Sequence, residues 1–191
     1  MPNPNRFMEK EEMNRENNNI GVAEVKLTID GYEDIFSEFD PRPLSERGLS
    51  GDFLFESDRA IMAKSVEKID FLMLMPEKNR DLRKEKTIKD RLTKYFRKHH
   101  ELIDREKKKI VKKGAIFTIS GIILMLVATI LFFKFRQEDF LTSFFTILLE
   151  PGGWFLFWEG LDLIIFESKE KVPNLKFYKR MANANIKFAS V

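Results

Sequence analysis

The sequence predicts an α+β membrane protein, in which a small two-stranded α/β cytosolic domain continues through one long helix into a two-helix transmembrane hairpin. Three observations indicate this fold class. Residues 114–133 are apolar and uncharged, and residues 140–166 form a second apolar run. Two segments with the pattern of strands precede these runs, at 22–29 and 68–75. Neither glycine nor proline interrupts residues 77–113, so a single helix can join the two parts.

The predicted transmembrane hairpin covers residues 114–166. Twenty residues of helix extend about 30 Å, which matches the hydrocarbon thickness of a bilayer, so residues 114–133 suffice for one crossing. The second arm, residues 140–166, is apolar enough to insert, but Glu150-Pro151-Gly152-Gly153 interrupts it. We therefore predict that the second arm is broken at 150–153. Neither half spans alone, so a kinked crossing and a re-entrant arm both fit its length.

The predicted cytosolic domain covers residues 21–113. Residues 22–29 alternate between apolar and polar side chains, and residues 68–75 form an apolar strand that ends at a proline. Ser50 can cap a helix between them, and a helical crossover favours a parallel strand pair. Two strands make a marginal sheet with open edges, so we expect a homo-oligomer. The apolar stripe from Ile88 to Ile110 either contacts another copy or packs on the strands of its own subunit.

Charge is distributed unevenly along the chain, although the formal net charge is only +3. Residues 21–66 hold five basic and ten acidic side chains, residues 94–113 nine and three, and residues 167–187 six and two. Both basic segments flank the hairpin, so we expect the cell (inner) membrane with both termini cytoplasmic. Anionic lipid headgroups then explain the basic segments, and no nucleic-acid partner is needed. Residues 1–20 are predicted to be disordered, and residues 167–191 to be a basic cytosolic tail.

Three carboxylates of the second arm are the candidate functional residues: Glu150, Glu159 and Asp162. A carboxylate in the middle of a bilayer costs about 2.5–3.5 kcal/mol on insertion scales, so it needs water, a partner or a place near the surface. In an oligomer these side chains can line an ion pathway or an interface. The alternative is that they lie near the two membrane surfaces, with Trp154 and Trp158 as membrane anchors.

Enzyme and cofactor motifs are missing from the sequence. It contains no phosphate-binding loop, dinucleotide-binding fingerprint, zinc-protease helix or nucleophile elbow. Cysteine is absent, and the two histidines, His99 and His100, are adjacent, so on a helix they point in different directions. The carboxylates of residues 30–58 do not have the spacing of a calcium loop. We therefore expect no catalytic residues, no cofactor and no metal.

Two local patterns resemble an uncharacterised group of prokaryotic two-pass membrane proteins. The first is Asp-Pro-x-Pro-x-x-Glu-Arg-x-Leu, formed here by Asp40, Pro41, Pro43, Glu46, Arg47 and Leu49. The second is Gly-Trp-x-x-x-Trp, formed by Gly153, Trp154 and Trp158. The chain departs from the group after Trp158, where it has Glu159-Gly160 in place of a basic residue and a proline. The resemblance implies the architecture and a prokaryotic inner membrane, but no activity.

These observations together predict a non-enzymatic, self-associating membrane module, whose cytosolic domain mediates assembly or binds a cytosolic protein partner while the hairpin anchors it in the lipid bilayer. The alternative function is an oligomeric cation channel or transporter subunit that uses the carboxylates of the second arm. The type of ion and the number of subunits are not predicted by the sequence.

Overall fold

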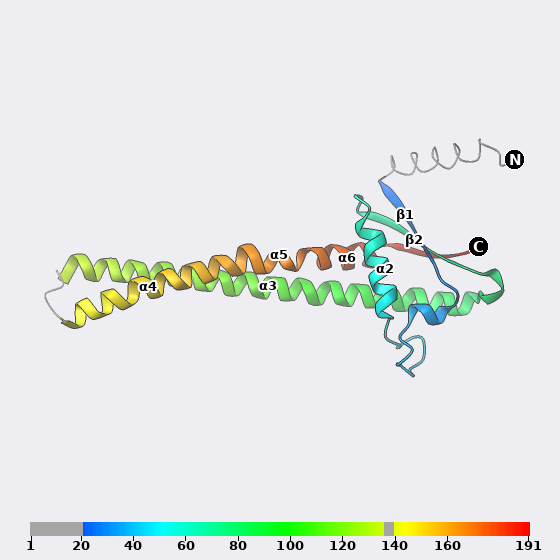
Figure 1. Ribbon diagram of the computed structural model, residues 1–191, viewed down its shortest axis with the longest axis horizontal. Coiled ribbons are helices and arrows are strands. Elements are labelled where there is room, and N and C mark those ends of the chain that lie inside the picture. Colours follow the sequence, from blue (N-terminus) through cyan, green and yellow to red (C-terminus); the bar gives the residue numbers. More distant parts are fainter. Residues whose placement is uncertain (1–20, 136–139) are drawn as a thin grey trace. The chain divides into compact units, whose positions relative to one another are not determined.

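The computed structural model describes residues 21–135 and 140–191 of the chain (Figure 1). The predicted disordered segment, residues 1–20, lies outside these ranges. The chain divides into two compact units. The first contains the described part of Met1–His100 together with Lys176–Val191, and the second is Glu101–Leu175. The two units are described separately below.

The first unit is built on a sheet of three parallel strands in the order β1-β2-β3. β1 (Val22–Thr28) and β2 (Lys68–Met75) lie where the sequence predicted strands, and their parallel pairing is confirmed. The prediction of only two strands is wrong, because β3 (Asn185–Ser190) pairs with the other edge of β2. The sequence pattern that would predict β3 is weak, because Ile186 and Phe188 are the only large apolar residues of this strand. Both side chains are buried in the core.

β3 comes from the segment 167–191, which was predicted to be a basic tail. This segment also contains α6 (Val172–Ala182), whose Phe177 and Met181 are buried in the same core as the sheet. Of the basic residues that suggested a tail, Arg180 is partly buried and donates to the carbonyls of Ile61 and Lys64, whereas lysines such as Lys179 and Lys187 are exposed. Lys187, for example, donates a 2.8 Å hydrogen bond to the carboxylate of Asp70 on β2. The C-terminal segment is therefore part of the folded domain.

One face of the sheet holds the core, and the other is charged. Alternate residues of β2, from Ile69 to Met75, are buried, and they pack with helix residues from three elements. These elements are α2 (Gly51–Met62), the first turns of α3 (Leu82–Phe135) and α6. The opposite face carries ion pairs, among them Lys26 with Glu24 at 3.1 Å. All described helices that cover the sheet thus pack on the same face, although parallel sheets usually have both faces covered.

The long helix predicted from the uninterrupted sequence is confirmed, since α3 contains 54 residues. The first part of its apolar stripe packs on the domain itself, because Ile88, Leu92 and Phe96 are fully buried in the core. Farther along the helix the stripe opens, and Leu102 is 44% exposed. The interpretation that the stripe packs on its own subunit is therefore right for its first half.

A buried ion pair fixes the start of α3 to the end of β3. The Arg80 guanidinium donates to both carboxylate oxygens of Glu85, at 2.8 and 3.2 Å, while Glu85 is only 4% exposed. Arg80 also donates to the Ser190 hydroxyl and to the carbonyl oxygen of Phe188. The hydroxyl of Tyr32, in η1 (Tyr32–Ile35), accepts a 2.7 Å hydrogen bond from the amide of Asp81. Arg80 therefore joins η2 (Glu77–Asn79) and α3 to the last strand.

The second unit contains the rest of α3 and α4 (Phe140–Asp162), followed by the π-helix η3 (Leu163–Glu167) and α5 (Ser168–Glu170). The predicted break at 150–153 is wrong, because α4 continues through Pro151. A proline removes one backbone hydrogen bond, and the bonds on either side of it are enough to keep this helix intact. The irregular part of the second arm is η3, where the helix widens before α5.

The connection between β2 and β3 is the most unusual feature of the chain (Figure 1). Parallel strands need a crossover, and one helix usually provides it. Here the crossover runs from residue 76 to residue 184 and contains both long helices. The apolar hairpin is therefore an insertion within a βαβ unit, with sheet on both sides of it in the sequence.

Candidate functional site

Small residues form the contact between α3 and α4. Every seventh residue on each helix is small and buried: Gly114, Gly121 and Ala128 on α3, and Thr146, Gly153 and Gly160 on α4. A Cβ added at Gly121 would lie 2.5 Å from the carbonyl oxygen of Gly153, and one added at Gly114 would lie 2.7 Å from that of Gly160. Such separations are too short for a real side chain. The glycines therefore allow the two backbones to approach closely, as in many membrane helix pairs.

This pairing gives each candidate carboxylate a level along the uncharged run of α3, residues 114–133. Glu150 lines a cavity together with α3 residues from Met125 to Phe133, so it is level with the second half of the run. Glu159 adjoins Gly160, which lies opposite Gly114, the first residue of the run. Asp162 lies farther along α4, beyond that end. The structure thus separates the three residues instead of gathering them into one site.

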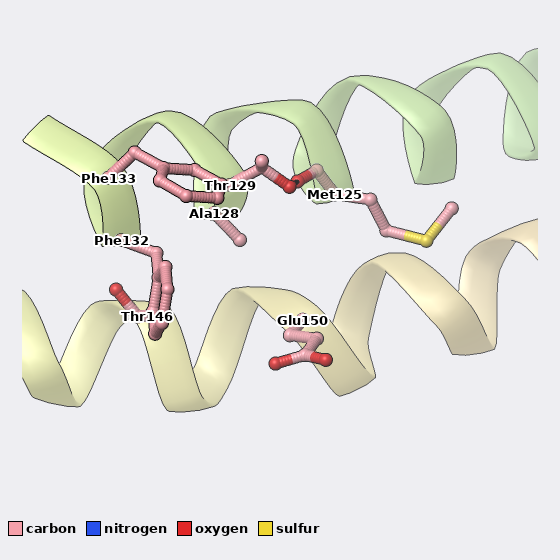
Figure 2. Close-up of a pocket in the computed structure, with 7 residues that line it drawn as sticks. All are labelled: Met125, Ala128, Thr129, Phe132, Phe133, Thr146 and Glu150. Atoms are coloured by element: carbon pink, nitrogen blue, oxygen red, sulfur yellow. Dashed lines mark hydrogen bonds between the residues drawn. The ribbon is translucent and has the colours of Figure 1, made fainter.

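The cavity that contains Glu150 lies between α3 and α4 and has a volume of about 360 Å³ (Figure 2). Its other walls are mainly apolar. They comprise Met125, Ala128, Thr129, Phe132, Phe133 and Thr146. Figure 2 shows that five of these seven residues come from α3, and only Thr146 and Glu150 come from α4. The rings of Phe132 and Phe133 meet edge to face, with centroids 5.4 Å apart.

The carboxylate of Glu150 forms no hydrogen bond or ion pair with any residue that the structure describes. The two threonine hydroxyls in the wall donate to their own helices, Thr129 to the carbonyl of Met125 at 2.8 Å and Thr146 to that of Thr142 at 2.9 Å. Glu150 is therefore the one charged group of the cavity, and neither threonine proton is directed toward it. A carboxylate in this setting can hold a cation or a proton, but no nucleophile lies beside it.

The two tryptophans lie on the outer side of α4. Trp154 and Trp158 are 54% and 52% exposed, and their rings meet edge to face at 5.6 Å. Trp158 is about half a turn of helix from Gly160, at the end of the uncharged run, whereas Trp154 follows Gly153 and is level with Gly121. The anchor role at a membrane surface stays a prediction, and Trp158 fits it better than Trp154.

The Asp40 motif forms a folded loop in the first unit. The Asp40 carboxylate accepts hydrogen bonds from the Arg42 guanidinium, at 2.7 Å, and from the amide of Gly48. These interactions hold the pKa of Asp40 well below its usual range. Arg91 of α3 donates to the backbone carbonyls of Glu46 and Arg47. The motif therefore has a structural explanation, since it fixes the loop against the long helix.

The walls that α3 contributes to the cavity were not found by sequence reasoning. Gly114, Gly121 and Ala128 lie seven residues apart, so the first arm lacks the four-residue glycine spacing of the best-known motif for close packing of membrane helices. The seven-residue spacing of small residues on both arms is the signal that could have found them, because it sets which residues face each other. From that register, Met125 and Ala128 are the expected neighbours of Glu150.

Within residues 21–135 and 140–191, no group of three or more His, Asp or Glu side chains is placed to hold a metal ion. Comparison of the chain with protein-family models, curated proteins and solved structures gives no match. The geometry of the hairpin and its cavity is therefore the basis for assigning a function.

Proposed function

We propose that the chain is a two-pass membrane protein that acts as a non-enzymatic, self-associating module, with its α/β domain in the cytosol of a prokaryotic cell. The observation that carries this proposal is that the hairpin exposes most of its large apolar side chains and buries small residues. Two helices are long and apolar enough to cross a membrane, yet only 11% of the most apolar stretch of each is buried. Ile123, Leu148 and Phe155 are all more than half exposed. An apolar surface of this extent is unstable in water and stable in lipid.

The strand order supports two complete crossings. β2 and β3 are hydrogen-bonded neighbours, so residues 75 and 185 lie in the same domain, on the same side of any membrane. The hairpin between them must then cross an even number of times. The register of the glycines matches the uncharged run of α3 to a similar length of α4, so both arms can span. A re-entrant second arm is not needed to bring the chain back.

Charge supports the orientation of this arrangement. Five lysines lie between Lys107 and Lys113, directly before the uncharged run of α3, and Lys169 and Lys171 follow α4. Lys171 also pairs with Glu106 across the two helices at 3.5 Å. Basic residues at this end of the hairpin favour the cytoplasmic side, and they attract anionic headgroups.

Self-association is supported by the surfaces that the domain leaves uncovered. β1 and β3 are both edge strands, and the charged face of the parallel sheet has no described helix over it. Parallel sheets usually have both faces covered, and an edge strand presents unpaired backbone groups with which another chain can pair. A second copy is the proposed partner, and a cytosolic protein is the other candidate.

Light scattering on the detergent-purified protein tests this function. A mass of two or more chains per complex, together with extraction by detergent but not by alkaline carbonate, is the expected result. A single chain per micelle over a wide concentration range would contradict self-association. Release by carbonate would contradict membrane insertion, and the two outcomes are independent.

A second candidate function, an oligomeric cation channel or transporter subunit, is favoured by the level of Glu150. A carboxylate inside an apolar span is costly unless water or a partner solvates it, and such residues therefore often mark a binding or transport site. Glu159 and Asp162, at the end of the span, carry little of this argument. Cation flux into liposomes that Glu150→Gln abolishes and Asp162→Asn leaves intact would favour this function over a passive anchor.

A further inference from the structure

The cavity between α3 and α4 has the composition of a ligand site, with one charge and otherwise apolar or ring surface. Its volume of about 360 Å³ falls in the range of about 300–1,000 Å³ that small-molecule pockets occupy. Glu150 supplies the only charge. The exposed rings of Phe132 and Phe133, 49% and 76% accessible, stand at the same cavity.

A metal ion does not suit these walls. Calcium takes about six to eight oxygen ligands, and magnesium requires an octahedral set. The cavity offers one carboxylate and two threonine hydroxyls whose protons are already donated to the backbone. A single carboxylate in an otherwise apolar cavity instead suits a cation that carries its own apolar groups, because the carboxylate can pair with the charge while the apolar walls contact the rest of the ligand.

The two apolar arms contain no counter-charge for Glu150. Neither residues 114–133 nor residues 140–166 include a lysine, arginine or histidine. The arms of a second copy of the chain have the same sequence, so they too would present no basic side chain. A bound cation can therefore supply the positive charge that neither arm provides.

We propose that this cavity binds a monovalent organic cation with apolar substituents, such as a substituted ammonium or phosphonium ion. The positive centre lies beside the Glu150 carboxylate, and the apolar groups contact Met125, Phe132 and Phe133. Ala128 and Thr146 are small, so they leave the space that the ligand fills. The inference rests on the second function proposed above, since it names the class of cation that the same carboxylate takes.

Equilibrium dialysis of tetraphenylphosphonium against the full chain in detergent micelles tests the site. We expect saturable binding, at least tenfold weaker for Glu150→Gln. Glu159→Gln is the matched control, because it removes the same charge from the same helix at the end of the span, and it should bind as the wild type does. Ala128→Phe fills the cavity without changing charge and should also weaken binding tenfold.

Several results would overturn the site. Binding that is equal in the wild type and Glu150→Gln would show partition into the micelle only. No saturable binding by the wild type, or an equal loss in Glu159→Gln, would also contradict it. Tetraphenylphosphonium binding and cation flux are then both measured with protein from the same purification. Flux that depends on Glu150 without phosphonium binding would reject this ligand class and leave the second function standing.

Discussion

The two units of the chain bury opposite kinds of residue. In the α/β domain, large apolar side chains such as Phe71, Ile88 and Met181 are inside, and lysines and most carboxylates are outside. In the hairpin most buried positions are held by glycine, alanine and threonine, with Leu163 as the exception, while most isoleucine, phenylalanine and tryptophan side chains are at least partly exposed. The same chain thus follows two packing rules within one continuous helix, α3.

The difference shows which force holds each unit together. Water drives the domain to remove apolar surface, so its stability depends on large side chains in the core. In the lipid environment proposed for the hairpin no such drive acts between apolar helices, so its stability depends on the close approach of two backbones. A large apolar side chain therefore contributes to stability in a different way at each end of α3. Matched substitutions can test this difference.

The largest expected effect is in the core of the domain. Phe71 on the central strand is fully buried and meets Phe53 edge to face at 6.3 Å. Phe71→Ala should lower the free energy of unfolding of the domain by about 3–5 kcal/mol. Amide hydrogen exchange of β2 in the full chain measures this free energy of unfolding. Phe39→Ala, at a side chain that is 96% exposed, is the control and should change it by less than about 0.5 kcal/mol.

The next largest effect distinguishes an apolar side chain exposed to lipid from one exposed to water. Ile123 on α3 and Phe55 on α2 are both exposed, at 53% and 66%. Ile123→Lys should cost about 3 kcal/mol of membrane insertion, because lysine is unfavourable in the middle of a span. Phe55→Lys should cost nothing measurable. Glycosylation mapping of insertion measures the first, and failure of the wild-type hairpin to insert would contradict a membrane location for it.

A smaller effect is expected at the helix contact. Gly121→Leu places side-chain atoms against the backbone of Gly153 and Phe157, and should weaken the hairpin by about 1–3 kcal/mol. Gly152→Leu is the matched control, since nothing lies within 4 Å of a Cβ added there. The chain has no cysteine, so a disulfide introduced across the two helices can report their separation. Equal cross-linking in both variants would contradict the glycine contact.

The smallest effect is the pH dependence of the Asp40 loop. Its pKa is lowered in the folded protein, so the carboxylate stabilises the fold above its ordinary pKa of about 4, and this contribution is lost as the pH falls through the lower folded value. Asp40→Asn should therefore lower the melting temperature at pH 7 and approach the wild type in acid. Glu38→Gln, at an exposed neighbouring carboxylate, should show no such convergence. A difference that persists in strong acid would mean that geometry, not charge, is lost.

Much of the architecture follows from local sequence patterns. The strands at 22–28 and 68–75, the long helix and the two apolar arms each have a clear period or length. β3 could not be predicted in the same way, because its pairing depends on a partner strand more than a hundred residues earlier. The continuity of α4 through Pro151 was also missed, since the local preference of proline and glycine is overridden by the rest of the helix.

The candidate site was predicted in part. Glu150, Glu159 and Asp162 were found because charge in an apolar segment is costly wherever it falls. Their separation was not predicted, because level along the hairpin depends on which residues face each other across the two helices. That register is set by backbone contacts of Gly114 and Gly121. Its indication in the sequence is the seven-residue spacing of small residues on both arms.

The place of β3 in the chain also sets an order of events during synthesis. The strand that completes the sheet leaves the ribosome only after both arms of the hairpin have been translated. A hairpin that fails to turn back leaves β3 unable to reach β2, and the domain then keeps an incomplete core that proteases can recognise. The sheet can thus be completed only after the apolar arms have returned the chain to β2, so a complete sheet is itself a sign that the hairpin has formed.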